Sequence, residues 1–179
     1  MTRIAALFVV FTLAACASKP PEDPRIAEVA GGVERTKTEF DHFTRFEGPR
    51  HPIGGADGWM LIRSWYDVKT DRFTHQLYVR VNYEGEAREY QYADYPGGKP
   101  AEIKVLEQDL DCPTGATSSA PCMWEEHVGL PVAHKELKRH VRRKESLRYR
   151  IVARKGAPVV IETPSYYLKG YLRAIDAAS

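Results

Sequence analysis

The cysteines are the residues of this chain whose spacing bears most directly on chemistry. Nine residues separate Cys112 from Cys122, whereas redox pairs usually have the tighter Cys-x-x-Cys spacing. Zinc-binding pairs are typically separated by about two to four residues, so the spacing also disfavours a zinc site that combines these cysteines with His134 and His140. We therefore expect no metal site and favour a structural role, with a redox pair and a zinc site as the alternatives.

Serine and histidine show no spacing typical of a catalytic site. The chain contains no Gly-x-Ser-x-Gly sequence, and Ser64, Ser146 and Ser165 lie in predicted strand or helix-cap contexts. His127 follows two glutamates, but no His-Glu-x-x-His motif is present. The glycine-rich residues 54–58 precede a predicted strand rather than a helix, which indicates a turn and not a phosphate-binding loop. We expect no catalytic role and no cofactor, and a hydrolase whose triad is scattered along the sequence is the alternative.

Positive charge is concentrated in one short segment. The formal net charge of the whole chain is only +2, which by itself predicts no partner. Six Lys or Arg nevertheless occur between positions 135 and 144, against one Glu. On an amphipathic helix they would form a positive stripe able to bind an anionic surface, although a solvent-exposed helix face is the simpler alternative. These residues are Lys135, Lys138, Arg139, Arg142, Arg143 and Lys144.

A short apolar segment lies at the amino terminus. Arg3 precedes Ile4–Leu13, ten residues that are apolar except for Thr12. This length is well below the ~20 residues that a helix needs to cross a bilayer, and it is typical of a cleavable signal peptide. The segment ends in Leu13-Ala14-Ala15-Cys16, which resembles the lipobox of bacterial lipoproteins.

The resemblance covers the first sixteen residues and implies how the chain is processed and where it resides. In lipoproteins the signal peptide, here residues 1–15, is removed and the sulfur of the following cysteine, here Cys16, carries a diacylglycerol. Ala17 stands where an Asp is associated with retention in the inner membrane, so the resemblance implies the periplasmic face of the outer membrane. The membrane is then a partner through the lipid anchor. The partner of the basic segment would be anionic lipid, lipopolysaccharide or an envelope protein, and nucleic acid is not expected. If the chain is instead a hydrolase, its substrate would be an envelope polymer.

Export also bears on the two remaining cysteines. Disulfides form and persist outside the reducing cytosol, so we expect Cys112 and Cys122 to be joined.

The middle of the chain alternates with a period of two, which is typical of strands with one buried face. The clearest strand is Phe73–Tyr83, and it is expected to pair with Trp59–Tyr66 through a polar turn. Further strands are predicted over Arg88–Ala93, Ala101–Leu110 and Met123–Val128. A hairpin of Leu147–Lys155 with Pro158–Thr163 completes the set.

Two segments have helical spacing instead. Pro131 at a first-turn position, followed by Leu137 and Val141, predicts a short amphipathic helix that ends near Lys144. A second helix is predicted to begin at Thr163 and Pro164, although Gly170 interrupts its pattern. The fold is therefore expected to be mainly β, an antiparallel β-sandwich or strongly curved sheet with two short peripheral helices.

Three segments are expected along the chain: a signal peptide (1–15), a lipid-anchored tether (16–35) and a single mainly β domain (36–179). Three prolines and several charges favour an extended tether, and a short helix formed by Ile26, Val29 and their apolar neighbours is the alternative. Six aromatic side chains are expected to pack in the core, and the alternative is that they line a groove for a glycan or peptide. They are Trp59, Trp65, Tyr78, Tyr90, Tyr92 and Tyr95.

Overall fold

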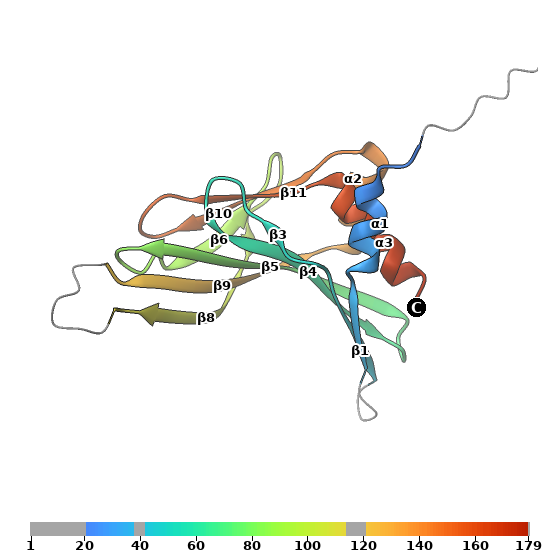
Figure 1. The fold of residues 1–179 in the computed structure, drawn as a ribbon, viewed down its shortest axis with the longest axis horizontal. Helices are drawn as coiled ribbons and strands as arrows, with labels where there is room; N and C mark the ends of the chain where they lie inside the picture. The colour runs from blue at the N-terminus through green and yellow to red at the C-terminus, as the bar shows by residue number, and fades with distance from the viewer. Residues whose placement is uncertain (1–20, 38–41, 114–120, 179) are drawn as a thin grey trace, which may run out of the picture.

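The computed structural model describes residues 21–37, 42–113 and 121–178 of the chain. These residues form two antiparallel β-sheets and three short helices, and the helices gather at one end of the sheets (Figure 1). The predicted fold class, a mainly β and sandwich-like domain, is confirmed. The described chain has one helix more than the two expected.

The larger sheet contains seven of the described strands, in the order β1-β2-β4-β5-β9-β8 with β3 paired to β4. Their bounds are β1 Glu34–Lys37, β2 Phe43–Glu47, β3 His51–Pro52, β4 Asp57–Asp67, β5 Arg72–Glu84, β8 Lys104–Asp111 and β9 Met123–Val132. The smaller sheet has the order β11-β10-β6-β7. Its strands are β6 Tyr90–Asp94, β7 Ala101–Glu102, β10 Leu147–Ala153 and β11 Val159–Thr163.

The hairpin of β4 and β5 follows from the alternation in the sequence. Alternate residues of β5 from His75 to Tyr83 are buried, while the residues between them point to the opposite face. The turn is stabilised by Asp67, whose carboxylate accepts hydrogen bonds from the Lys69 backbone N–H and the Thr70 hydroxyl, both at 2.9 Å. The predicted pairing of these two strands is therefore confirmed.

The segment after β5 does not continue as a meander within one sheet. β5 pairs with β9, and β6 pairs with β10 in the smaller sheet. The strand predicted over Ala101–Leu110 is divided, because β7 pairs with β6 whereas β8 pairs with β9. Ile103, between the two short pairings, is only 8% exposed. Its burial holds the chain where it passes from one sheet to the other.

The hydrophobic core lies between the inner faces of the two sheets and extends under the helices. Most strands of both sheets contribute their alternate residues to it, as the period-two pattern predicts. Burial of an aliphatic or aromatic side chain stabilises the fold by about 1.5 to 3 kcal/mol relative to its exposure. The largest fully buried members include Phe46, Met60, Ile62, Leu77, Leu130, Ile151 and Ile161.

The three helices pack together through α3. Their bounds are α1 Pro24–Gly31, α2 His134–Arg143 and α3 Ser165–Asp176. A Cβ atom on Gly170 of α3 would lie 2.6 Å from the Ile26 carbonyl oxygen and 2.8 Å from the Val29 Cβ, both on α1. The glycine that interrupts the pattern of the last helix therefore permits α1 and α3 to approach closely.

Much of the predicted tether is folded onto the domain. Pro24 occupies the first position of α1, where its missing N–H is not needed, and Asp23 caps the helix by accepting a hydrogen bond from the Arg25 backbone N–H at 3.0 Å. Residues 24–31 are thus the short helix that the sequence left as the alternative, and β1 begins at Glu34. The expectation of an extended tether through residue 35 is corrected accordingly.

The starts of α2 and α3 differ from their predicted positions. Pro131 lies in β9, not in the first turn of α2, and β8 pairs with β9 only as far as Gly129. A strand position with a single neighbouring strand tolerates a residue that lacks an N–H. Thr163 does not cap α3, because it is fully buried at the end of β11, where its hydroxyl donates to the Met60 sulfur at 3.7 Å.

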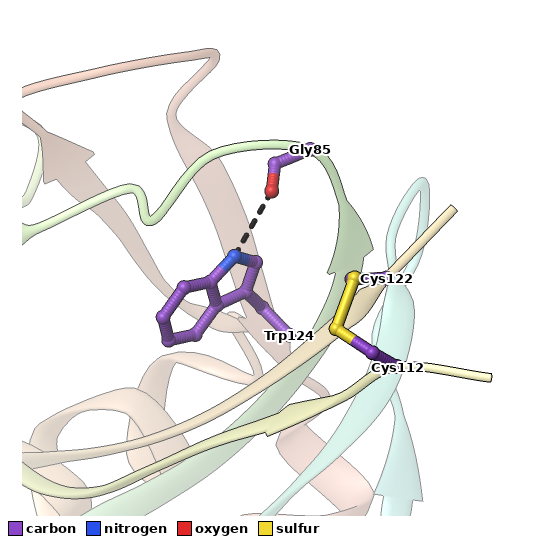
Figure 2. The surroundings of a disulfide bond; sticks show 4 residues. All are labelled: Gly85, Cys112, Cys122 and Trp124. Carbon is purple, nitrogen blue, oxygen red and sulfur yellow. Dashed lines mark hydrogen bonds between the residues drawn. A yellow bond between two sulfur atoms is a disulfide. The ribbon is translucent and has the colours of Figure 1, made fainter. Parts of the chain in front are cut away.

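Cys112 and Cys122 form the predicted disulfide, which joins the ends of β8 and β9 (Figure 2). Because β9 runs from this bridge to α2, the disulfide lies at the opposite end of the domain from the helices (Figure 1). Nearby, the Trp124 indole N–H donates to the Gly85 carbonyl oxygen at 2.9 Å and ties β9 to the turn that follows β5.

The predicted signal peptide and Cys16 lie outside the described residues. Among the residues that are described, no helix has both the length and the apolar character required to span a membrane.

Removing the disulfide is expected to destabilise the domain. In the chain-entropy model, closing a loop of this length stabilises the folded state by about 2 to 3 kcal/mol. The double variant Cys112→Ala/Cys122→Ala should lose about this much free energy of unfolding in urea titrations under oxidising conditions. Reductant should lower the stability of the wild type and leave the double variant unchanged. Equal stability of the two oxidised proteins would contradict the prediction.

Candidate functional site

The six predicted basic residues lie on α2 and at its carboxyl end, and all are exposed. Leu137 is fully buried on the opposite side of the helix, so α2 is the amphipathic helix that the sequence predicts. Arg142 and Arg143 occupy the last turn, where positive charge interacts favourably with the helix dipole. We call the set Lys135, Lys138, Arg139, Arg142, Arg143 and Lys144 the basic α2 surface.

Most of this charge is not neutralised within the domain. Arg139 forms an ion pair with Glu136 at 3.0 Å, one turn earlier on the same helix. The other five cations form no ion pair with any residue in the described part of the chain. An exposed cluster of one sign creates a positive potential that attracts anions.

The basic α2 surface lies at the same end of the domain as the entry of the chain. α1 and α2 both pack against α3, and Figure 1 shows the three helices together. Before α1, Glu22 forms ion pairs with Lys169 at 2.6 Å and Arg173 at 3.2 Å, both on α3. The amino-terminal segment is therefore fixed to the helical end from residue 22 onward.

A chain of hydrogen-bonded side chains connects α2 to the core beneath it. The Ser64 hydroxyl shares hydrogen bonds with the Tyr171 hydroxyl at 2.6 Å and with His75 Nδ1 at 2.5 Å. His75 Nε2 in turn shares a hydrogen bond with His134 Nδ1 at 2.8 Å. The Phe73 ring stacks on both imidazoles, with centroid distances of 5.5 and 5.9 Å. The first residue of α2 is thereby attached to β4, β5 and α3.

Burial makes both histidines poor bases. His75 is only 2% exposed, and its desolvation lowers its pKa to about 4, with further lowering by His134 and Lys138. The pKa of His134 is also lowered, mainly by burial and then by Lys138, while Asp176 opposes the shift. The attachment of α2 therefore depends on neutral imidazoles.

The contact between Ser64 and His75 has the residue types of a hydrolase but not the accessibility. Ser64 is fully buried, so a substrate carbonyl cannot reach its hydroxyl without opening the domain. The second nitrogen of His75 contacts His134, whereas a catalytic histidine is usually oriented by a carboxylate. The alternation of β5 identifies His75 as buried, but its contact with His134, 59 positions later, follows only from the fold.

The residues considered for zinc are not brought together. Cys112 and Cys122 are joined at one end of the domain, whereas His134 and His140 lie on α2 at the other end. No group of three or more His, Cys, Asp or Glu within the described segments could hold a metal ion.

His127, which follows the two glutamates, is not at an edge of its sheet. It lies within the larger sheet, where β9 is flanked by β5 and β8, and it is 8% exposed. Its ring contacts the Tyr78 hydroxyl and the Glu125 carboxylate, the latter at 2.7 Å.

The aromatic residues that could have formed one groove are divided between three places. Tyr90 is buried in the core, Tyr92 is exposed on the smaller sheet, and Tyr95 packs edge-on against Tyr149. The other three share the outer face of the larger sheet: Trp59, Trp65 and Tyr78.

The buried histidine makes stability depend on pH. Because its pKa is about 4 in the folded state and near 6.5 when exposed, the unfolded chain binds the proton more tightly, so stability is full above pH ~6.5 and falls as the pH drops towards 4. The loss should be on the order of 3 kcal/mol for this group. His75→Gln should flatten the dependence of the unfolding free energy on pH, as measured by urea titration.

A matched control is His42→Gln, which replaces an exposed histidine. It should leave the pH dependence of the wild type unchanged. An undiminished loss of stability in His75→Gln would show that other groups cause it.

Comparison with known proteins does not assign the chain to a family. No protein-family model matches it, and no significant match was found among curated proteins or among solved structures. The functional argument therefore rests on the residues and geometry described above.

Proposed function

We propose that this chain is a lipid-anchored, noncatalytic binding protein of the bacterial cell envelope, attached through Cys16 at the periplasmic face of the outer membrane. In this arrangement the helical end faces the bilayer and the basic α2 surface binds anionic lipid headgroups. The observation that carries the proposal is the short distance along the chain between Cys16 and the point where the chain is fixed to α3.

Chain length limits how far the helical end can lie from a lipid on Cys16. Glu22, with its two ion pairs to α3, follows Cys16 by six residues. Six fully extended residues span at most about 20 Å. A lipidated Cys16 would therefore keep α1, α2 and α3 close to the membrane, while the disulfide end would point away from it.

The charge on α2 suits that position. A Lys or Arg near an anionic lipid surface contributes about 1 kcal/mol of attraction, and the field decays within a Debye length, which is about 8 Å at physiological ionic strength. Five cations without an ion pair in the described chain can therefore contribute to orientation, but only when the helix is held near the surface. Acyl chains, at about 0.8 kcal/mol per buried CH₂, would supply the attachment itself.

A noncatalytic role is supported by the burial of Ser64 and His75, whose contact resembles part of a catalytic site. Ser64 is inaccessible and its hydroxyl is occupied by two hydrogen bonds within the core. This cluster stabilises the helical end on which the proposed membrane contact depends.

Lipidation of Cys16 is tested by metabolic labelling. Cells grown with a palmitate analogue should label the wild-type chain, and the chain should sediment with membranes. Cys16→Ser should abolish the label and release the chain from the membrane fraction. Cys112→Ser/Cys122→Ser, which removes the other two cysteines and their disulfide without touching the lipobox, should remain labelled. An unlabelled wild type would exclude the lipid anchor.

The contact of α2 with lipid is tested on the mature chain carrying Cys16→Ser, so that no acyl chain contributes to binding. It should float with vesicles rich in phosphatidylglycerol and not with phosphatidylcholine vesicles. Lys138→Glu/Arg142→Glu should weaken this binding about tenfold or more, since each cation contributes about 1 kcal/mol.

The control makes the same change of charge at the opposite end of the domain. Arg154→Glu/Lys155→Glu lies in the turn between β10 and β11, the end of these strands remote from α2 and α3. This pair should bind vesicles nearly as the wild type does. An equal loss of vesicle binding in both double variants would mean that the net charge of the chain, and not the basic α2 surface, determines binding.

A further inference from the structure

The outer face of the larger sheet carries the side chains of β4 and β5 that the core does not use. Successive outer positions of β4 are Trp59, Leu61, Arg63 and Trp65, and those of β5 include Gln76, Tyr78, Arg80 and Asn82. An outer sheet face is ordinarily covered by small and charged residues that are well hydrated. This face instead carries two tryptophans, a tyrosine and four planar polar groups.

The rings and planar groups of this face are in contact with one another. The Trp59 and Tyr78 rings are 5.7 Å apart and tilted by 33°, and the His127 ring lies 5.4 Å from Tyr78. The Arg63 guanidinium lies 4.3 Å from the Tyr78 ring and 5.3 Å from the Trp65 ring. The Arg63 Nε–H donates to Gln76 Oε1 at 2.7 Å, and the stacked guanidinium keeps its remaining N–H groups available in its own plane. The surface is therefore a fixed platform of rings with hydrogen-bonding groups between them.

Several polar atoms beside the platform have no partner. Among the described residues, Trp59 Nε1, Arg80 Nε and Asn82 Oδ1 are buried side-chain atoms without a hydrogen bond. Trp59 is directly opposite Arg80 in the pairing of β4 with β5, and Asn82 is the next outer residue of β5. Buried polar atoms without partners are costly. A ligand that both accepts and donates hydrogen bonds would relieve this cost when the side chains shift towards it, because the three atoms themselves are shielded from solvent.

Two shallow hollows flank the platform. One, of about 220 Å³, is lined by Trp65, Gln76, Lys104 and Pro131 together with neighbouring residues. The other, of about 240 Å³, includes Arg80, Asn82 and Glu125. Each is smaller than the ~300 to 1,000 Å³ of pockets that enclose a small molecule. Trp59 and Trp65 are six residues apart on β4, which corresponds to about 20 Å, so the face suits a chain lying across it.

We infer that this outer face binds a strand of pyranose sugars, which stacks on Trp65 and, after displacing the Arg50 guanidinium that lies 4.4 Å from the Trp59 ring, on the Trp59–Tyr78 pair. The C–H face of a sugar ring packs on an aromatic ring, and each hydroxyl both donates and accepts hydrogen bonds. Arg63, Gln76, Arg80, Asn82 and Glu125 supply the complementary planar groups. The inference goes beyond the proposed membrane contact and does not depend on the lipid anchor.

Charge and backbone pairing favour a sugar strand over the other polymers. Arg63, Arg80 and Lys104 on this face are balanced by Glu107, Asp109 and Glu125, so the face does not select a polyanion. A peptide that extends the sheet would pair with β8, the end strand, and not with the strands under the rings, because β4, β5 and β9 each have a neighbour on both sides over most of their length. An uncharged chain that binds through side chains alone fits these conditions.

The test uses the mature chain carrying Cys16→Ser and isothermal titration with three probes: chitohexaose, cellohexaose and soluble peptidoglycan strands. The wild-type sheet face should bind at least one probe, with little dependence on salt between 50 and 300 mM. Trp65→Ala should weaken binding about fivefold, the effect of losing one aromatic contact, and Trp65→Phe should restore most of it. Tyr92→Ala, which removes an exposed aromatic ring from the other sheet, should bind as the wild type does.

Several outcomes would overturn the inference. In the first, the folded wild type binds none of the three probes. In the second, Trp65→Ala and Tyr92→Ala weaken binding equally. In the third, Lys138→Glu/Arg142→Glu abolishes binding while Trp65→Ala leaves it intact. Unchanged circular dichroism and melting temperature establish that each variant is folded. The acyl chain is absent from every protein in this test. A negative titration would therefore not contradict the lipid anchor, and a negative labelling experiment would not contradict the sugar-binding face.

Discussion

The packing of α3 against the inner face of the larger sheet is the contact on which the helical end depends. The Tyr167 hydroxyl donates to the Pro49 carbonyl oxygen at 2.7 Å and accepts from the Ile62 backbone N–H at 3.4 Å. A Cβ atom on Gly48 would lie 2.5 Å from the same hydroxyl, so the glycine leaves the space that the tyrosine occupies. One turn later, Tyr171 reaches Ser64. Two tyrosines on successive turns thus fix the helix in position and rotation.

The other helices take their places from α3. α1 approaches it closely at Gly170, and α2 contacts it while being held to the sheet by the hydrogen bond between His134 and His75. The entry of the chain, the basic α2 surface and the buried polar chain therefore form one unit at one end of the sheets. The disulfide closes the other end, and the aromatic face lies along the side of the larger sheet. Because these surfaces are separate, the proposed membrane contact and the inferred sugar-binding face do not compete for the same residues.

Local sequence patterns predicted most of the individual elements. The hairpins of β4 with β5 and of β10 with β11 were predicted because each strand has one buried face, and apolar residues therefore alternate with polar ones in its sequence. The patterns failed where the partner changes along the chain. The strand predicted from Ala101 to Leu110 crosses between sheets at Ile103, and Pro131 extends β9 beyond the end of its pairing with β8. Neither feature has a local signal, because both depend on where a neighbouring strand ends.

Four features could be predicted from sequence: the mainly β class, the joining of Cys112 to Cys122, the amphipathic basic helix and the lipobox-like pattern at the amino terminus. Each of these is encoded by residues close together in the chain. Other features emerge only in the folded chain. α1 folds onto α3, Ser64, His75 and His134 meet, and Trp59, Trp65 and Tyr78 share a face that excludes Tyr90 and Tyr92. Alternation in the sequence indicates which side of a strand is buried, but the neighbour that covers that side is selected by the combined packing of residues far apart in the sequence.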